Sequence, residues 1–215
     1  METNFNFYSR LNLIELLGRR AKNVIELLEG LRQVPASSIY YHTHRFLQQH
    51  HFLSPEPPND FAFWVVNSLG LDILGEKLAS VDLVKFRTIE GLREKYIGLL
   101  ESFNQIQTLR CVESQEGEEF HFMSCRTFVL PTGYEARDLR EFSEILQKVS
   151  INSIYFHVFE ARLRLERGED DFSNWLESIG QKALAREISR LDPYTMTLEG
   201  LRKKMFGMVS RYVRT

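Results

Sequence analysis

Residues 5–42 read FNFYSRLNLIELLGRRAKNVIELLEGLRQVPASSIYYH, and 115 positions later residues 120–157 read FHFMSCRTFVLPTGYEARDLREFSEILQKVSINSIYFH. Thirteen of these 38 aligned positions are identical, where ordinary residue frequencies give about two or three. Farther on, Asp60-Phe61-x-x-Trp64 recurs as Asp171-Phe172-x-x-Trp175, and TIEGLR at 88–93 recurs as TLEGLR at 197–202. Because the start, middle and end all recur, the sequence predicts an internal duplication.

The repeat predicts how the chain is divided. We expect one repeat unit over residues 1–103, a connecting strand and hairpin over 104–119, and a second unit over 120–215. Residues 5–101 and 120–212 are expected to superpose around a pseudo-two-fold axis, with any ligand site near that axis. The first unit has four extra residues, which we assign to the proline-rich loop at Ser54–Pro58.

The hydrophobic pattern predicts the elements of each unit. Alternation from Phe5 and from Phe120 predicts a half-buried strand, and Gly18 and Gly133 are expected to turn the chain from that strand into a helix. Helical spacing follows at residues 21, 24, 27, 31 and 34 and at their counterparts from 136 to 149.

Capping residues predict where the later helices begin. We expect caps at Ser38 and Ser153, at Asn59 and Asp170 or Asp171, and at Thr88 and Thr197. Residues 108–113 and 120–127 flank Gln115-Glu116-Gly117, which predicts a hairpin. The predicted fold is mainly α (α+β): two tandem helical repeat units with a small antiparallel sheet.

Composition limits the classes of function. The 215 residues include 27 Lys+Arg and 29 Asp+Glu, for a formal charge of −2, so we expect neither nucleic acid nor a membrane as partner. Cys111 and Cys125 are the two cysteines, which offers no disulfide framework and favours a cytoplasmic location. The densest apolar run, residues 61–66, is too short to span a bilayer, which needs roughly 20 residues.

Three segments carry a resemblance to a known family. They are SIYYHTHRFLQQHH at 38–51, PPNDFA at 57–62 and SIYFH at 153–157. With them, essentially the whole chain resembles a bacterial family of uncharacterised proteins, described only as a domain of unknown function. The resemblance implies no activity, substrate or catalytic residue.

A polar set recurs in the two units and forms the candidate site. Its members are Tyr40, His42 and Asp60 in the first unit, and Tyr155, His157 and Asp171 in the second. One interpretation is a satisfied network in the core, because buried polar groups need partners. The other is a pocket in which His42 or His157 binds a ligand or moves a proton. Recurrence in both units favours the structural interpretation.

One position in this region breaks the symmetry of the repeat. Arg45 in the first unit corresponds to Glu160 in the second, one helical turn after the paired histidines. Opposite charges at equivalent positions can meet across a two-fold axis. If the two histidine helices pack at that axis, we expect an Arg45–Glu160 ion pair, and we include both residues among the ligand-binding candidates.

The histidines of the first unit raise the question of a metal. His42, His44, His50 and His51 lie within ten residues, and His157-x-x-Glu160 is a second candidate pair. On a helix, however, His42 and His44 point in different directions, so we favour the absence of a metal site.

No phosphate-binding glycine-rich loop or nucleophile elbow is present in the sequence, and the sequence identifies no cofactor. We favour a non-catalytic binding or interaction protein whose partner is an unidentified small molecule or protein. The alternative is an enzyme that uses His42 or His157 as acid, base or metal ligand.

Overall fold

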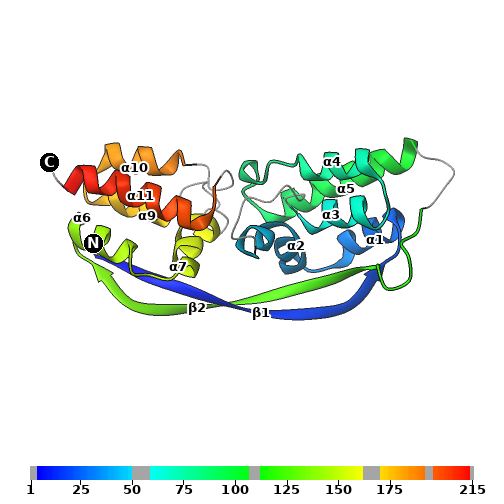
Figure 1. Ribbon diagram of the computed structural model, residues 1–215, viewed down its shortest axis with the longest axis horizontal. Coiled ribbons are helices and arrows are strands. Elements are labelled where there is room, and N and C mark those ends of the chain that lie inside the picture. Colours follow the sequence, from blue (N-terminus) through cyan, green and yellow to red (C-terminus); the bar gives the residue numbers. More distant parts are fainter. Residues whose placement is uncertain (1–3, 50–58, 107–111, 162–169, 192–195, 214–215) are drawn as a thin grey trace. The chain divides into compact units, whose positions relative to one another are not determined.

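The computed structural model describes residues 4–49, 59–106, 112–161, 170–191 and 196–213 (Figure 1). These residues are mainly helical and include a two-stranded antiparallel sheet, as predicted. It divides into two compact units. Among the described residues, the α1–α5 unit contains 13–49, 59–106 and 112–126, and the α6–α11 unit contains 4–12, 127–161, 170–191 and 196–213.

The helices follow the same order in both units. The first unit contains α1 (Val24–Gln33), α2 (Ala36–Gln49), α3 (Asp60–Asn67), α4 (Asp72–Ala79), a 3-10 turn at Leu83–Lys85 and α5 (Ile89–Ile106). The second contains α6 (Leu139–Leu146), α7 (Ile151–Tyr155), a π-helical turn (Phe156–Glu160), α9 (Asp171–Ser178), α10 (Lys182–Ser189) and α11 (Leu198–Val213). Counterparts begin at residues that the sequence repeat pairs. Superposition of 5–101 on 120–212 stays a prediction.

The strands β1 (Phe5–Ala21) and β2 (Phe120–Ala136) are much longer than the alternating segments that predicted them. Their first residues pack on the helices of the other half of the chain. The Phe5 ring lies 5.8 Å from that of Phe142 in α6, and the Phe120 ring lies 5.4 Å from that of Phe61 in α3. The compact units therefore have different bounds from the contiguous division at 1–103 and 120–215.

Side-chain contacts show the register of the two strands. Asn4 donates to Glu135 at 2.6 Å, the Thr132 hydroxyl donates to the Phe7 carbonyl at 2.6 Å, and Thr127 donates to Asn12 at 2.9 Å. Each step forward on β1 is matched by an equal step back on β2, as in an antiparallel pair. The residue opposite Asn12 is its own counterpart in the sequence repeat.

The expected strand-to-helix turns at Gly18 and Gly133 are wrong, because both strands continue past them to Ala21 and Ala136. Both glycines have positive φ, 70° and 75°, a conformation that other residues adopt at a cost.

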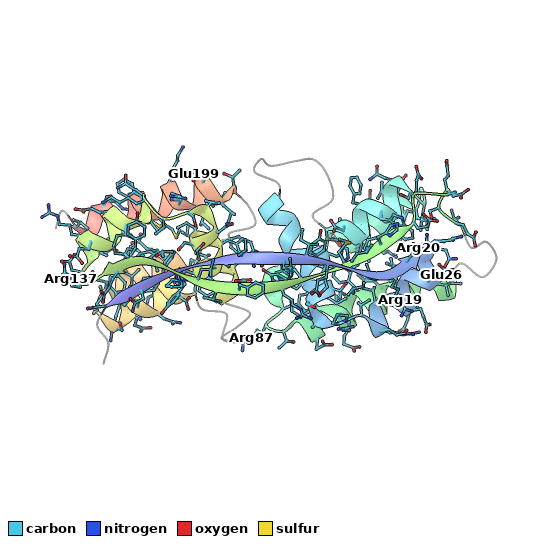
Figure 2. All side chains as sticks on the ribbon, turned by 90° about the horizontal axis from the view of Figure 1, so that it is seen from below. Arg19, Arg20, Glu26, Arg87, Arg137 and Glu199 are labelled. Atoms are coloured by element: carbon cyan, nitrogen blue, oxygen red, sulfur yellow. The ribbon has the colours of Figure 1, made fainter. Side chains whose placement is uncertain are left out.

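The strand-to-helix junction is instead made by side chains that cap α1 and α6. Asn23 accepts from the Glu26 amide at 2.9 Å, while Glu26 accepts from the Lys22 amide at 2.8 Å. Asp138, Glu141 and Arg137 repeat the arrangement at 2.8 and 2.9 Å. This reciprocal pairing satisfies amides that a helix start leaves free. Figure 2 shows Glu26 and Arg137 at these junctions.

The predicted hairpin over residues 108–127 is also wrong where it can be followed. A turn does occur, with the Glu118 amide donating to the Gln115 carbonyl at 3.0 Å. Residues 112–119 nevertheless form no strand, and β2 pairs with β1. Residues 108–111 and the expected loop at 54–58 lie outside the described residues.

Most predicted helix caps are confirmed. Asn59 and Asp170 cap α3 and α9, and Thr88 and Thr197 accept from amides in the first turns of α5 and α11. The caps expected at Ser38 and Ser153 are wrong, because both serines are buried inside helices that begin earlier. Along the described segments, no helix is both long and apolar enough to cross a bilayer.

Candidate functional site

His42 joins two helices and a strand within the α1–α5 unit. Its Nδ1 lies 2.8 Å from Oδ2 of Asp60, at the start of α3, and its Nε2 accepts a hydrogen bond from the backbone amide of Met123 in β2 at 2.9 Å. The ring lies 4.7 Å from that of Phe120, and the residue is 2% exposed. His42 therefore holds the beginning of β2 against α2 and α3.

His157 makes the same three connections in the α6–α11 unit. Its Nδ1 lies 2.8 Å from Oδ2 of Asp171 at the start of α9, and its Nε2 accepts from the backbone amide of Tyr8 in β1 at 2.8 Å. The ring contacts Phe5 at 4.9 Å. Tyr8 and Met123 are counterparts in the repeat, as are the two histidines.

These hydrogen bonds define the protonation of both rings. A backbone amide can only donate, so each Nε2 must be unprotonated. The proton of the neutral ring is then on Nδ1, where it is donated to the aspartate. Burial lowers the pKa of His42 below its ordinary value of 6.5, and the hydrogen bond with Asp60 opposes that shift. Both nitrogens of each imidazole are thus occupied.

The tyrosines of the predicted sets contact the residue four positions later. The Tyr40 ring stacks on His44 at 5.4 Å, and the Tyr155 ring stacks on Phe159 at 4.7 Å. His44 is buried, and its Nδ1 lies 2.8 Å from the Thr43 hydroxyl. Residues two apart on a helix face different directions, which separates each tyrosine ring from the histidine–aspartate pair beside it.

Glu160 pairs with Arg10 of β1, and both belong to the α6–α11 unit. The Arg10 side chain is fully buried, and its guanidinium lies 4.0 Å from the centre of the Tyr155 ring. Glu160 therefore has a cationic partner within its own unit. The side chain of Arg45 lies outside the described residues, so the Arg45–Glu160 pair stays a prediction. The counterpart of Arg10 is the buried Cys125.

The metal-site candidates are only partly described. In the ranges that the structure describes, no three residues of the types His, Cys, Asp and Glu gather as a metal site would require. His42 and His44 bond to Asp60 and Thr43, respectively. His50 and His51 lie outside those ranges.

In each unit an arginine that the sequence analysis did not single out binds carbonyl groups at a helix end. Arg93 of α5 donates to the carbonyls of Leu31 and Val34, both at 2.7 Å, at the end of α1. Arg202 of α11 donates to the carbonyl of Val149 at 2.8 Å, just after α6. The last carbonyls of a helix lack partners within it. The repeated TIEGLR and TLEGLR segments carried this signal, because both end in the arginine.

The π-helical turn at Phe156–Glu160 was not predicted and distinguishes the two units, because α2 is α-helical over the whole of Ala36–Gln49. Such turns occur frequently at functional sites. Here the turn carries His157 and Glu160, the residues that bind Tyr8 and Arg10 of β1.

Comparisons with known proteins identify a family and a similar solved structure and assign no activity. Residues 2–210 match a family described as a family of unknown function, DUF5752, and the chain belongs to this family. The chain is also similar to the solved structure of OrfY from Thermoproteus tenax, with 29% identity and a TM-score of 0.82 over 98% of this chain and 95% of that one. No curated protein matches.

Proposed function

Starting from membership of this family of unknown function, we propose that the chain is a non-catalytic binding or interaction protein in which His42 and His157 anchor strands. The observation that carries the proposal is the double engagement of each imidazole by an aspartate and a strand amide. A general acid or base must exchange a proton with its substrate. For either nitrogen to do so, a buried hydrogen bond of the fold must first break.

The energetic comparison favours the structural role. Releasing Nε2 from its amide leaves a buried donor unpaired, which costs about 1–3 kcal/mol. Both histidines are 2% exposed, so a substrate would also have to displace the strand to reach the ring. The alternative, an enzyme using His42 or His157, requires such a displacement in every catalytic cycle.

Exposed apolar side chains on the strands support an interaction role. In the α6–α11 unit, Leu11 is 60% exposed, Phe128 opposite it on β2 is 49% exposed, and Leu130 on the same face of β2 is 46% exposed. Clustered apolar surface of this kind is a common feature of sites that bind another protein. We therefore infer that the partner is a protein that binds this exposed apolar surface. The two histidines are buried and present no group to such a partner.

We further infer that the chain arose by internal duplication. The paired helix starts, the two histidine anchors and the two arginines at helix ends all follow the sequence repeat. A cytoplasmic location and a bacterial origin remain predictions from sequence. The buried thiol of Cys125 is consistent with a reducing compartment.

Nitrogen NMR of the full chain, labelled with 15N-histidine, tests the anchoring role. At pH 7.5 we expect His42 and His157 to be neutral with the proton on Nδ1, and to be unaffected by added Zn²⁺. The variants His42→Gln and His157→Gln assign the signals, and the exposed His121 serves as an internal reference. A zinc-induced shift at either anchor, or a proton on its Nε2, would contradict the proposal.

A further inference from the structure

A small polar pocket lies between α9 and α10, which pack together in the α6–α11 unit (Figure 1). It has a volume of about 160 Å³. Its walls include Ser173, Asn174 and Glu177 from α9 and Lys182, Ala185 and Arg186 from α10. It is separate from the His157–Asp171 pair, and its function does not depend on the role of the histidines.

The corresponding place in the α1–α5 unit is closed by packing. Val66 corresponds to Glu177 at the shift of 111 set by Asp60 and Asp171, and Gly75 corresponds to Ala185 at the shift of 110 set by the first residues of α4 and α10. A Cβ added at Gly75 would lie 2.2 Å from Cγ2 of Val66, so these two residues are in direct contact with no room between them. In the second unit, Glu177 and Ala185 stand in place of this close pair, and both line the pocket.

The polarity of the lining changes along with its shape. Lys182 and Arg186 stand where the first unit has Asp72 and Glu76, and Ser173 and Asn174 stand where it has Ala62 and Phe63. The α10 side of the pocket is thus basic where α4 is acidic, and the α9 side carries hydrogen-bonding groups where α3 is apolar. Since the order of the helices and the histidine anchors are shared by the two units, this concentrated difference points to a property of the second unit alone.

The charges around the pocket are available to a ligand. Lys182 and Arg186 are one helical turn apart, so they lie on the same face of α10. Within the parts of the chain that the structure describes, neither cation forms an ion pair, and Glu177 forms none either. Two unpaired cations favour an anion, and Arg in particular favours a carboxylate or phosphate. Glu177 and Asn174 can bind hydroxyl groups of the same molecule.

From these observations we infer that the pocket between α9 and α10 binds a small hydroxylated anion, whose carboxylate or phosphate lies against Lys182 and Arg186. The volume admits a small metabolite and is below the range of about 300–1,000 Å³ usual for drug-sized ligands. The shared chemistry is one anionic group with neighbouring hydroxyls.

Calorimetric titration of the full chain at low ionic strength tests this inference. The probes are glycerol 3-phosphate, glycerate and uncharged glycerol. Saturable binding of either anion, with much weaker binding of glycerol, is expected, and the preferred anion distinguishes phosphate from carboxylate. The double variant Lys182→Gln/Arg186→Gln should weaken binding by about tenfold or more, because charge-assisted hydrogen bonds are lost.

Two further variants distinguish binding in the pocket from a general effect of the protein's charge. Lys203→Gln/Lys204→Gln on α11 removes the same charge from exposed positions outside the pocket and should leave affinity nearly unchanged. Glu177→Val/Ala185→Gly restores the residues of the closed unit and should abolish binding without unfolding the chain, as judged by its melting temperature. Absence of binding by both anions, equal binding of glycerol, or equal loss in the Lys203/Lys204 control would overturn the inference.

Discussion

The backbone amide of Tyr8 donates to Nε2 of His157 at 2.8 Å, although 149 positions separate the two residues in the chain. Met123 and His42 form the equivalent hydrogen bond at 2.9 Å over 81 positions. Through these contacts, the start of each strand is held by helices from the other half of the sequence. Neither compact unit is therefore made from one continuous half of the chain.

Alanine substitution of the histidines should destabilise the protein by similar amounts. His42→Ala and His157→Ala each leave a buried strand amide and an aspartate without a partner, which is expected to lower the free energy of unfolding by about 1–3 kcal/mol. Urea denaturation measures the loss. His121→Ala, at an exposed position, should change stability by less than about 0.5 kcal/mol. Unchanged stability in both anchor variants would exclude an anchoring role.

Stability should fall as the pH is lowered through the range in which His42 becomes protonated. Burial lowers the pKa of His42 in the folded chain below its ordinary value of 6.5, so the unfolded state binds the proton first. The stabilisation is complete above about pH 6.5 and decreases below it, by up to about 1.4 kcal/mol per pH unit for one group. Urea unfolding between pH 7.5 and 5.5 measures this slope. His42→Gln should make it shallower, and an identical slope in that variant would exclude His42 as its source.

Local signals allowed much of the secondary structure to be predicted. Asn59, Asp170, Thr88 and Thr197 were assigned as caps because a side-chain oxygen needs only the next few residues to complete its hydrogen bond. Ser38 and Ser153 were misassigned because Ala36 and Ile151 already extend those helices toward the N-terminus. The pairing of His42 with Asp60 was anticipated from recurrence in the repeat.

The long-range features could not be predicted in the same way. Alternation showed where β1 and β2 begin, but not that each would be 17 residues long and continue past Gly18 or Gly133 to Ala21 or Ala136. The central parts of both strands carry consecutive exposed apolar residues, such as Leu13 and Ile14 in β1 and Phe128 to Leu130 in β2, which conceals the period of two. Arg10 contacts Glu160 because the first residues of β1 pack in the α6–α11 unit. No local sequence pattern encodes this long-range placement.

The Arg10–Glu160 pair should contribute more to stability than an ion pair at the surface. Arg10→Met leaves Glu160 without its cation in a largely buried place and is expected to cost about 3 kcal/mol. Arg10→Met/Glu160→Leu should recover most of this loss, because no unpaired charge remains. Urea denaturation of the single and double variants gives the coupling energy. The exposed Arg140–Glu144 pair is the control, and Arg140→Met should cost less than about 0.5 kcal/mol. Additive effects of the Arg10 and Glu160 substitutions would contradict this prediction.

Glycine substitutions should have opposite effects in strands and helices. Gly18→Ala and Gly133→Ala place a side chain at positive φ, so each should destabilise the protein by about 1–2 kcal/mol, even though the space around both is open. Gly98→Ala in α5 and Gly207→Ala in α11 also meet open space, and should stabilise by up to about 1 kcal/mol through helix propensity. Thermal unfolding compares the four variants. A stabilising substitution at Gly18 would show that the strand does not require this conformation.

Substitution of Arg93 should remove the hydrogen bonds that join α5 to the end of α1 and so destabilise the protein. Its guanidinium donates to the Leu31 and Val34 carbonyls, both at 2.7 Å, and its Nε lies 2.8 Å from Glu90. Arg93→Met removes the donors and leaves carbonyls at the helix end without partners, so we expect a loss of about 2–3 kcal/mol in urea denaturation.

Three comparisons define the cause of that loss. Arg93→Lys keeps the charge but cannot reproduce the planar fork that reaches both carbonyls, so it should recover only part of the stability. Arg202→Met should cost less than Arg93→Met, because its contacts to the carbonyls of Val149, Gln147 and Leu146, at 2.8, 3.2 and 3.5 Å, are only partly buried or exposed, whereas those of Arg93 are buried. Arg87, labelled in Figure 2, is exposed and precedes α5, so Arg87→Met serves as the control, with an expected change below about 0.5 kcal/mol. Equal losses in the Arg93→Met and Arg87→Met variants would mean that removal of positive charge, and not the bonds to the end of α1, accounts for the effect.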